Sequence, residues 1–282
     1  MIIDAQVHLW EADRPDRPMD PNAKPHLPEP MTAERMLALM DEAGIDRAVI
    51  SPLYLPGNAP DYALEVAARY PDRFRVMGWY QPSDPTHFAK LERWLDQPGM
   101  CSIRLSLNEP HGSKLLAEGT LEPFWAAAER LQIPVAVFRL GGIAEVMEPI
   151  LERYPDFRLI VDHLNMPISP EVRDARMASL ERLARFPNVT VKVSALPLFS
   201  QEPPPFADLQ PMIQRVHAAF GAQRMMWGSD QTQQIARNKC TYRENLDIIR
   251  VEAARWLPPG DVDWILGKTA ARVFNWPEPS AA

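Results

Sequence analysis

The chain has 282 residues, which is enough to bury a large core and to build one α/β barrel of roughly 250 residues. Its formal net charge of -7 argues against nucleic acid or an anionic membrane surface as the main partner. Cys101 and Cys240 are the only cysteines, which excludes a disulfide framework and a cysteine metal cluster.

The start of the chain has no basic segment followed by an apolar run, and no apolar stretch approaches the roughly 20 residues of a membrane span. We therefore expect a cytoplasmic protein with no membrane partner. The 30 prolines are about twice the usual share, and they are spread along the chain, so they indicate boundaries between elements rather than a disordered tract.

The first predicted element is a strand over residues 2–10, whose side chains alternate between two faces. One face is apolar. The other is polar or aromatic, and it either lines a pocket or faces water. The apolar face holds Ile3, Ala5, Val7 and Leu9, and the second face holds Asp4, Gln6, His8 and Trp10.

A long proline-rich loop over 11–30 follows, and then a helix over 32–43 that Thr32 caps and Gly44 ends. From there, strand-like runs alternate with helical segments to the end of the chain. The predicted strands are 47–52, 74–80, 100–107, 135–140, 158–164, 189–194 and 224–229, and the further helices are 61–69, 85–96, 121–131, 144–153, 170–185, 207–220, 242–256 and 261–274.

One short pattern joins helix to strand at three places: Arg69–Asp72, Arg153–Asp156 and Arg185–Asn188. Its proline cannot continue the helix, its Asp or Asn suits a turn, and its aromatic residue can pack beneath the sheet. Eight strands alternating with helices predict a parallel sheet closed as a single (β/α)8 TIM barrel, with an extra C-terminal helix, over one domain of residues 1–282. The rival is an open doubly wound sheet, but no G-x-G-x-x-G follows a strand to support its dinucleotide-binding form.

In a barrel, the residues that carry chemistry lie at the carboxyl ends of the strands. His8 and Asp230 should approach each other, because the first and last strands of a closed barrel are neighbours. Two imidazoles and a carboxylate at one mouth can hold a divalent metal, or they can polarise a carbonyl and activate water without one. The strand-end rule selects His8, Arg104, Arg139, His163, Lys192 and Asp230.

Five segments, in this order along nearly the whole chain, resemble the amidohydrolase superfamily, and in particular its branch of sugar-lactone and 2-pyrone-4,6-dicarboxylate lactonases. They are Asp4–Trp10, Val161–Leu164, Val191–Ser194, Trp227–Asp230 and Leu266–Phe274. The resemblance implies a (β/α)8 barrel with a His-x-His on the first strand, a His on the sixth and an Asp after the eighth.

His8, His163 and Asp230 match that pattern, but Gln6 stands where the first histidine is expected. Where metal-binding relatives have a fourth-strand Lys or Glu, this chain offers Arg104, whose permanent charge repels a cation. The resemblance therefore argues against a binuclear centre. A mononuclear site for a metal such as zinc would use His8, His163 and Asp230, with Gln6 as a poor fourth ligand, but we expect no cofactor, as in some lactonases of this branch.

The expected activity is hydrolysis of a lactone, such as a carboxylate-bearing sugar-acid or muconate-type lactone. Asp230 would take a proton from the attacking water and pass it to the leaving alkoxide, while His8 and His163, with Gln6, donate hydrogen bonds to the oxyanion. Arg104 and Arg139 would bind an anionic group of the substrate. Trp10 and Lys192 are further candidates for contact with the substrate.

Three other functions stay open: lactone isomerisation, metal-dependent decarboxylation, and ligand binding by a barrel without activity. The competing structural readings are that His163 is a satisfied core histidine, that Asp230 caps the next helix, and that Arg104 pairs with a carboxylate inside the barrel. The partner is expected to be a small anionic molecule, and a homo-oligomer is possible.

The sequence gives the remaining polar residues less specific roles. Asp4 is expected to orient the strand or a neighbour rather than to react. The loops over 11–30 and 197–206 are expected to shape specificity. The four remaining histidines, which lie in predicted loops or helices, are expected at the surface: His26, His87, His111 and His217.

Overall fold

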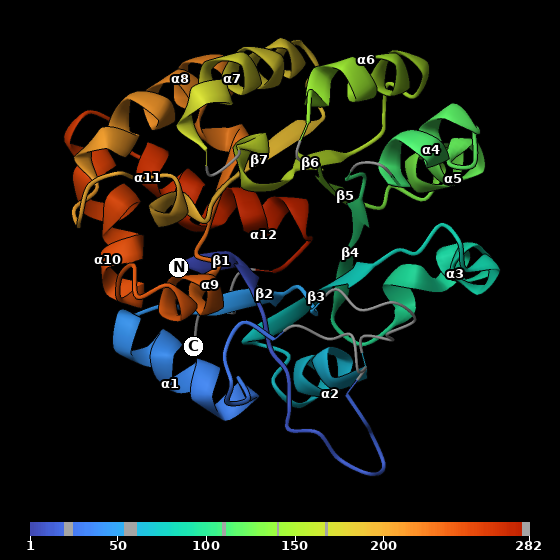
Figure 1. The fold of residues 1–282 in the computed structure, drawn as a ribbon, viewed down its shortest axis with the longest axis horizontal. Coiled ribbons are helices and arrows are strands. Elements are labelled where there is room, and N and C mark those ends of the chain that lie inside the picture. Colours follow the sequence, from blue (N-terminus) through green and yellow to red (C-terminus); the bar gives the residue numbers. More distant parts are fainter. Residues whose placement is uncertain (20–24, 54–60, 109–110, 140, 167–168, 278–282) are drawn as a thin grey trace.

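The computed structural model describes residues 1–282 except 20–24, 54–60, 109–110, 140, 167–168 and 278–282. Eight parallel strands follow one another in sequence order, and the helices surround them (Figure 1). This confirms the predicted (β/α)8 TIM barrel. The strands are β1 (Ile3–Val7), β2 (Arg47–Ile50), β3 (Phe74–Trp79), β4 (Met100–Ser106), β5 (Val135–Phe138), β6 (Leu159–Val161), β7 (Val189–Ser194) and β8 (Met225–Gly228).

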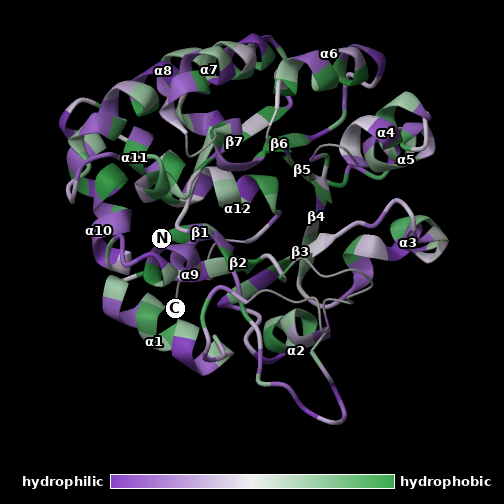
Figure 2. Ribbon diagram, in the orientation of Figure 1, coloured by the Kyte–Doolittle hydropathy of each residue, from purple (hydrophilic) through white to green (hydrophobic). Residues whose placement is uncertain are grey.

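The helices around the strands carry both hydrophobic and hydrophilic residues, as helices with one face on a sheet do (Figure 2). No described helix combines the length and the apolar character needed to cross a membrane. The helices are α1 (Ala33–Ala43), α2 (Asp61–Arg69), α3 (Pro85–Lys90), α4 (His111–Ala117), α5 (Glu122–Arg130), α6 (Ile143–Arg153), α7 (Arg173–Arg182), α8 (Gln210–Phe220), α9 (Gln231–Ala236), α10 (Tyr242–Asp247), α11 (Asp261–Asp263) and α12 (Thr269–Val273).

Local signals set most of these bounds. Thr32 accepts a hydrogen bond from the backbone N–H of Arg35 at the start of α1, and Gly44 ends the helix at a φ of 76°. At the three predicted joints, an arginine guanidinium lies over the ring of the next residue, at 5.0 Å on Tyr70, 5.7 Å on Tyr154 and 4.6 Å on Phe186. These rings pack against the core, as the repeated pattern predicts.

Some predicted bounds are wrong. The strand predicted over 158–164 ends at Val161, because the following residues turn sharply into left-handed backbone. The sequence does not predict the short helices α4 and α9, because seven and six residues are too few to show a helical period. The helices predicted over 242–256 and 261–274 contain wider π turns at Ile248–Glu252 and Trp264–Lys268. Residue 140, at the end of a predicted strand, lies outside the described residues.

The predicted alternation of apolar and polar faces is correct for only the first half of the first strand. Ile3 and Ala5 belong to a small cluster inside the barrel, whereas Val7 and Leu9 belong to the larger core that includes the helices. The pairing of β1 with β2 is irregular between Asp4 and Val7. Such an irregularity exchanges the two faces of a strand, so the single alternation predicted over 2–10 is wrong.

The last strand returns to the first. The N–H of Asp230 donates to the carbonyl of Gln6 at 3.1 Å, and this contact sets the end of β8 beside β1. At the opposite end of the barrel, Phe274 and Trp276 pack with the interior cluster, directly after α12, which lies at the centre of Figure 1. The predicted extra C-terminal helix therefore closes one end of the barrel, and the other end stays open.

Candidate active site

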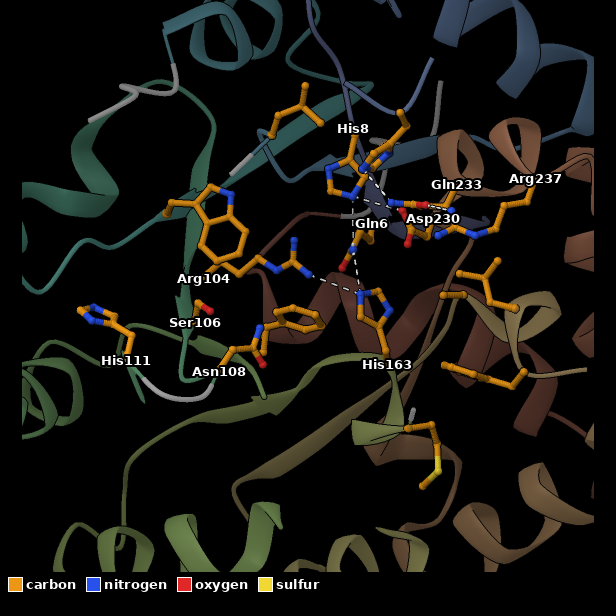
Figure 3. A pocket seen from close by; sticks show the side chains of 18 of the residues that line it. Gln6, His8, Arg104, Ser106, Asn108, His111, His163, Asp230, Gln233 and Arg237 are labelled. Carbon is orange, nitrogen blue, oxygen red and sulfur yellow. Dashed lines mark hydrogen bonds and ion pairs between the residues drawn. The ribbon is translucent and has the colours of Figure 1, made fainter. Parts of the chain in front are cut away.

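A cavity of about 1200 Å³ lies at the carboxyl ends of the strands (Figure 3). Loop residues take part in its lining: His26 comes from the loop after β1, and Leu198 and Phe199 come from the loop after β7. Both loops expected to shape specificity therefore reach the cavity. The polar residues that line it include Gln6, His8, His26, Arg104, His163, Asp230, Gln233 and Arg237.

The amide of Gln6 has a defined orientation. The ammonium group of Lys192, which can only donate, donates to Oε1 of Gln6. The NH2 group of Gln6 therefore points the other way, where its nitrogen lies 3.1 Å from Nε2 of His163 and 3.5 Å from Nε2 of His8. At the position where the family pattern expects an imidazole, this chain presents N–H donors.

The neighbours of His163 determine its tautomer. Nε2 faces two donors, the amide of Gln6 and Nη2 of Arg104 at 3.3 Å, so this nitrogen accepts. The proton lies on Nδ1, which is 2.9 Å from Oγ of Ser194. Burial lowers the pKa of His163 to about 4, so the ring is neutral at neutral pH. The expected donation from His163 to an oxyanion does not fit this arrangement, because Nε2 carries no proton.

His8 and Asp230 form the second polar pair. Nδ1 of His8 lies 2.6 Å from the carbonyl of Ser51, which can only accept, so Nδ1 carries a proton. Nε2 lies 3.1 Å from Oδ1 of Asp230 (Figure 3). Burial by itself raises the pKa of Asp230, but the hydrogen bond and charge of His8 outweigh it and hold this pKa well below its usual range. Because the carboxylate of Asp230 can only accept, Nε2 of His8 is the donor of this contact.

The carboxylate of Asp162 balances the positive charges of two buried side chains below the cavity. It accepts from Nε of Arg104 at 2.6 Å and from Nζ of Lys192 at 2.7 Å. Burial raises its pKa, but these two charges outweigh burial and hold the pKa well below its usual range. The guanidinium of Arg104 also lies 4.6 Å from the ring of Trp79 and 5.3 Å from that of Phe138. The reading that pairs Arg104 with a carboxylate inside the barrel is therefore correct.

The sequence predicts His26 to be a surface residue, and this is wrong. Its ring meets the ring of His8 edge-on at 4.9 Å. Arg237 donates to Oε1 of Gln233, so the Gln233 amide nitrogen, 2.7 Å from Nε2 of His26, is the donor of that contact. Nδ1 of His26 then donates to Oγ1 of Thr232 at 2.7 Å. Burial lowers the pKa of His26 to about 4.

The donor set can be compared with the needs of a zinc ion, which takes ligand atoms with free lone pairs. Ligand atoms of His8, His26 and Asp230 lie within 4.8 Å of one another. The predicted set has His163 in place of His26, and Nε2 of His163 uses its lone pair to accept from Gln6 and Arg104. The Nε2 lone pair of His26 is also used, and Gln6 presents N–H groups. Both ring nitrogens of His8 donate, to Ser51 and to Asp230, so Asp230 is the one member of the set with free lone pairs, and the set does not fit a resident zinc.

Three residues expected to contact the substrate do not line the cavity. Trp10 is buried in the larger core and lies beyond the end of β1, where its N–H donates to the carbonyl of Met31 at 3.0 Å. Arg139 is half-buried, and its Nη1 donates to the carbonyl of Leu107 at 2.9 Å. Lys192 is fully buried beneath Gln6. Trp10 and Arg139 thus lie behind the residues that line the cavity, and Lys192 orients the amide of Gln6.

The other three histidines lie away from the pair of His8 and Asp230. His111 is exposed and lines the far side of the cavity (Figure 3). Nδ1 of His87 accepts from the N–H of Gln81 at 3.0 Å, and Nε2 of His217 lies 2.7 Å from Oδ2 of Asp261. The sequence missed Asp162 as well as His26. Asp162 had a signal, since it is a carboxylate at the end of an apolar strand, whereas His26 lies in a long loop with no pattern.

The backbone is left-handed directly after three neighbouring strands. The φ angles are 50° at His163, 56° at Ala195 and 52° at Asp230, and none of these residues is a glycine. Such angles are sparsely populated for residues with a Cβ and tend to cluster at functional sites. Asp230 makes no capping hydrogen bond to α9 with its side chain, so the reading of Asp230 as a helix cap is wrong.

Asp4 connects β1 to the turn that carries Asp230. Its Oδ1 accepts from the backbone N–H groups of Gln6 and Ser229, both at 2.9 Å. Its Oδ2 accepts from the hydroxyl of Tyr242 at 2.5 Å. Asp4 lies outside the cavity lining, and its three contacts hold β1 against that turn.

Burial raises the pKa of Asp4 from 3.8 to about 6, so its favourable contribution to stability is present below pH 3.8 and is lost as the pH rises through 6. Asn at this position keeps both N–H contacts and can donate to Tyr242. Between pH 4 and pH 8, we expect the free energy of unfolding of Asp4→Asn to rise by about 2.5 kcal/mol relative to wild type, measured by urea unfolding. The exposed Asp96→Asn is the control. A constant difference across pH would contradict the prediction.

The family model for amidohydrolases matches residues 3–276. This chain belongs to the amidohydrolase family. The match covers all eight strands and the helices between them, and the first of these strands carries Gln6.

Two curated relatives of this amidohydrolase are lactone hydrolases. L-fucono-1,5-lactonase from Burkholderia ambifaria is 25% identical over 232 residues, which is 81% of this chain and 79% of the relative. 4-Sulfomuconolactone hydrolase from Rhizobium radiobacter is 24% identical over 212 residues, 73% of this chain and 68% of the relative. These similarities support a lactone-hydrolysing enzyme of the family.

Solved structures share the fold. An amidohydrolase from Burkholderia multivorans with bound HEPES superposes with a TM-score of 0.83 at 19% identity, over 98% of this chain and 100% of the other. The form of that protein with bound zinc gives a TM-score of 0.78 at 18% identity, with the same coverage.

Proposed function

We propose that this amidohydrolase opens a lactone by adding water to its carbonyl, without a resident metal. The observation that carries the proposal is the buried pair of His8 and Asp230 at the open end of the barrel, with Nε2 and Oδ1 3.1 Å apart. The pair joins a proton donor to a carboxylate that can accept a proton. The similarity to two lactone hydrolases supports the choice of substrate.

Asp230, His8 and Gln6 have separate roles in the proposed reaction. Asp230 accepts a proton from water while the water oxygen bonds to the carbonyl carbon. Nε2–H of His8 and the second N–H of Gln6 donate to the oxygen that becomes negative. When the tetrahedral intermediate collapses, the bond from carbon to ring oxygen breaks, and Asp230 returns its proton to the leaving alkoxide.

Substrate binding itself would make Asp230 a better base. In the free site, His8 donates to Asp230 and thereby holds its pKa low. A carbonyl oxygen placed against Nε2 of His8 takes over this hydrogen bond, and Asp230 loses the interaction that stabilises its charged form. The pKa of Asp230 then rises when the carbonyl is in position to be attacked.

The experiment is proton release from a panel of sugar-acid and muconate-type lactones, followed in weak buffer, with NMR of the same mixtures. Expected is ring opening at an unchanged rate after treatment with EDTA and after zinc addition. A product with the ring intact and shifted would establish an isomerase. Loss of activity with EDTA and its return with zinc would contradict metal independence. This part of the test is needed because a protein of the same fold contains bound zinc.

A further inference from the structure

Four charged carboxylate or guanidinium side chains line the described part of the cavity, and three of them have either a charged partner or a role in capping a helix. Arg104 is compensated by Asp162, and Asp230 is compensated by His8. The third caps α3 by accepting from the N–H of Thr86 at 2.8 Å. The four are Asp84, Arg104, Asp230 and Arg237.

Arg237 is the exception. It is exposed at the end of α9, and its hydrogen bond goes to the neutral amide of Gln233. Among the described residues, no carboxylate lies within ion-pair distance of it. One of its five N–H groups is used by Gln233, so an edge of the guanidinium remains for two parallel hydrogen bonds to an anion.

The position of Arg237 relative to the reacting groups is also defined. Arg237, Gln233 and Asp230 lie on the same side of the cavity in Figure 3. The six residues of α9 separate Asp230 from Arg237. Seven residue steps along a helix span roughly 10 Å, so the backbone of Arg237 lies about one substituted ring away from that of Asp230.

Gln233 holds this guanidinium in relation to the site. Its Oε1 accepts from Arg237 and its amide nitrogen donates to His26, whose ring touches that of His8. The side chain of Arg237 is therefore oriented by a chain of hydrogen bonds that ends beside the reacting pair.

We propose that Arg237 binds a carboxylate or sulfonate substituent of the substrate, and that the enzyme therefore prefers anionic lactones. This inference rests on the proposed lactone hydrolysis. It transfers the anion-binding role expected for Arg104 and Arg139 to Arg237, because Arg104 already shares Asp162 with Lys192 and Arg139 lies outside the cavity lining.

The test compares matched lactones that differ at the group far from the ring carbonyl. The pairs are galactaro-1,4-lactone with galactono-1,4-lactone, and muconolactone with its methyl ester. The measured quantity is the ratio of kcat/KM for the anionic member to kcat/KM for the neutral member. We expect Arg237→Met to lower this ratio roughly 10- to 100-fold, mainly through KM, and Arg237→Lys to lower it less.

Lys239→Met is the matched control, because it removes one positive charge two residues further on and lies on a different cavity. We expect it to leave the ratio unchanged. The proposal is overturned if Arg237→Met lowers both rates equally, because Arg237 then acts only through Gln233 and His26. A wild-type preference for the neutral lactones overturns it as well.

Failure of the proposed function can be recognised separately. If wild type opens none of these lactones, calorimetric titration with galactarate and galactonate replaces turnover. Tighter binding of galactarate that weakens at least tenfold in Arg237→Met supports the anion site while the hydrolysis proposal fails. Equal binding of both acids, or no binding of galactarate, overturns the anion site too.

Discussion

Replacing Asp230 with asparagine is expected to lower kcat for lactone opening by roughly 10²- to 10⁴-fold, the usual contribution of a general acid–base group. Asn keeps the shape of the side chain and can still contact Nε2 of His8, which lies 3.1 Å from Oδ1 in the wild type. It cannot accept the proton of the attacking water. The measurement is the rate of acid release at saturating lactone, with KM expected to change little.

The matched control for this variant is Asp84→Asn. Asp84 lines the same cavity, but its carboxylate caps α3 through the N–H of Thr86. We expect this variant to stay within a few-fold of the wild-type kcat. Turnover of Asp230→Asn near the wild-type rate would contradict the assignment of Asp230 as the base, provided that circular dichroism shows both variants folded.

The largest expected effect on stability comes from Asp162→Asn. The carboxylate of Asp162 is fully buried and compensates both Arg104 and Lys192. Its removal leaves two buried cations without a counter-ion. Breaking a buried ion pair in this way typically costs about 3–5 kcal/mol, and we expect Asp162→Asn to lose about that much stability. The free energy of unfolding in urea measures it.

Two further variants test this explanation. Lys192→Met leaves Arg104 paired with Asp162, so we expect a smaller loss, about 1–3 kcal/mol, from the unsatisfied oxygens of Gln6 and Asp162. The double variant Asp162→Asn/Lys192→Met leaves one uncompensated cation and should fall between the single variants. An Asp162→Asn variant that is more stable than Lys192→Met would contradict the charge argument.

The pH dependence of Asp162→Asn gives a further check. A buried lysine without a counter-ion has a lowered pKa in the folded state, so its protonation opposes folding below the unfolded value. The favourable contribution of the neutral lysine to stability is therefore present at high pH and is lost as the pH falls through the unfolded pKa. We expect the deficit of Asp162→Asn to shrink between pH 7 and pH 9.5, and to shrink less in the double variant.

Local signals account for most of the fold. The cap at Thr32, the glycine at position 44 and the repeated proline joints act between residues close in sequence, so the pattern could locate them. The strand-end rule likewise located His8 and Asp230, because a closed parallel barrel makes the first and last strands neighbours. The family resemblance identified Gln6 as the departure from the usual ligand set.

Contacts between distant segments account for what the sequence missed. Trp10 lies beyond the end of β1 and pairs with Met31 from the end of the following loop, and alternation along one strand cannot show such a contact. His26 comes from a long loop without periodicity, and its place beside His8 depends on Thr232 and Gln233.

The sequence by itself therefore determined the barrel, its open end and the pairing of His8 with Asp230, since these depend on local periodicity and strand order. Only the tertiary structure decided how protons and charges are distributed. Lys192 orients Gln6, Gln6 and Arg104 fix the tautomer of His163, and these contacts join β1, β4, β7 and the turn after β6. A donor or acceptor role depends on the partner, and these partners lie far apart in the sequence.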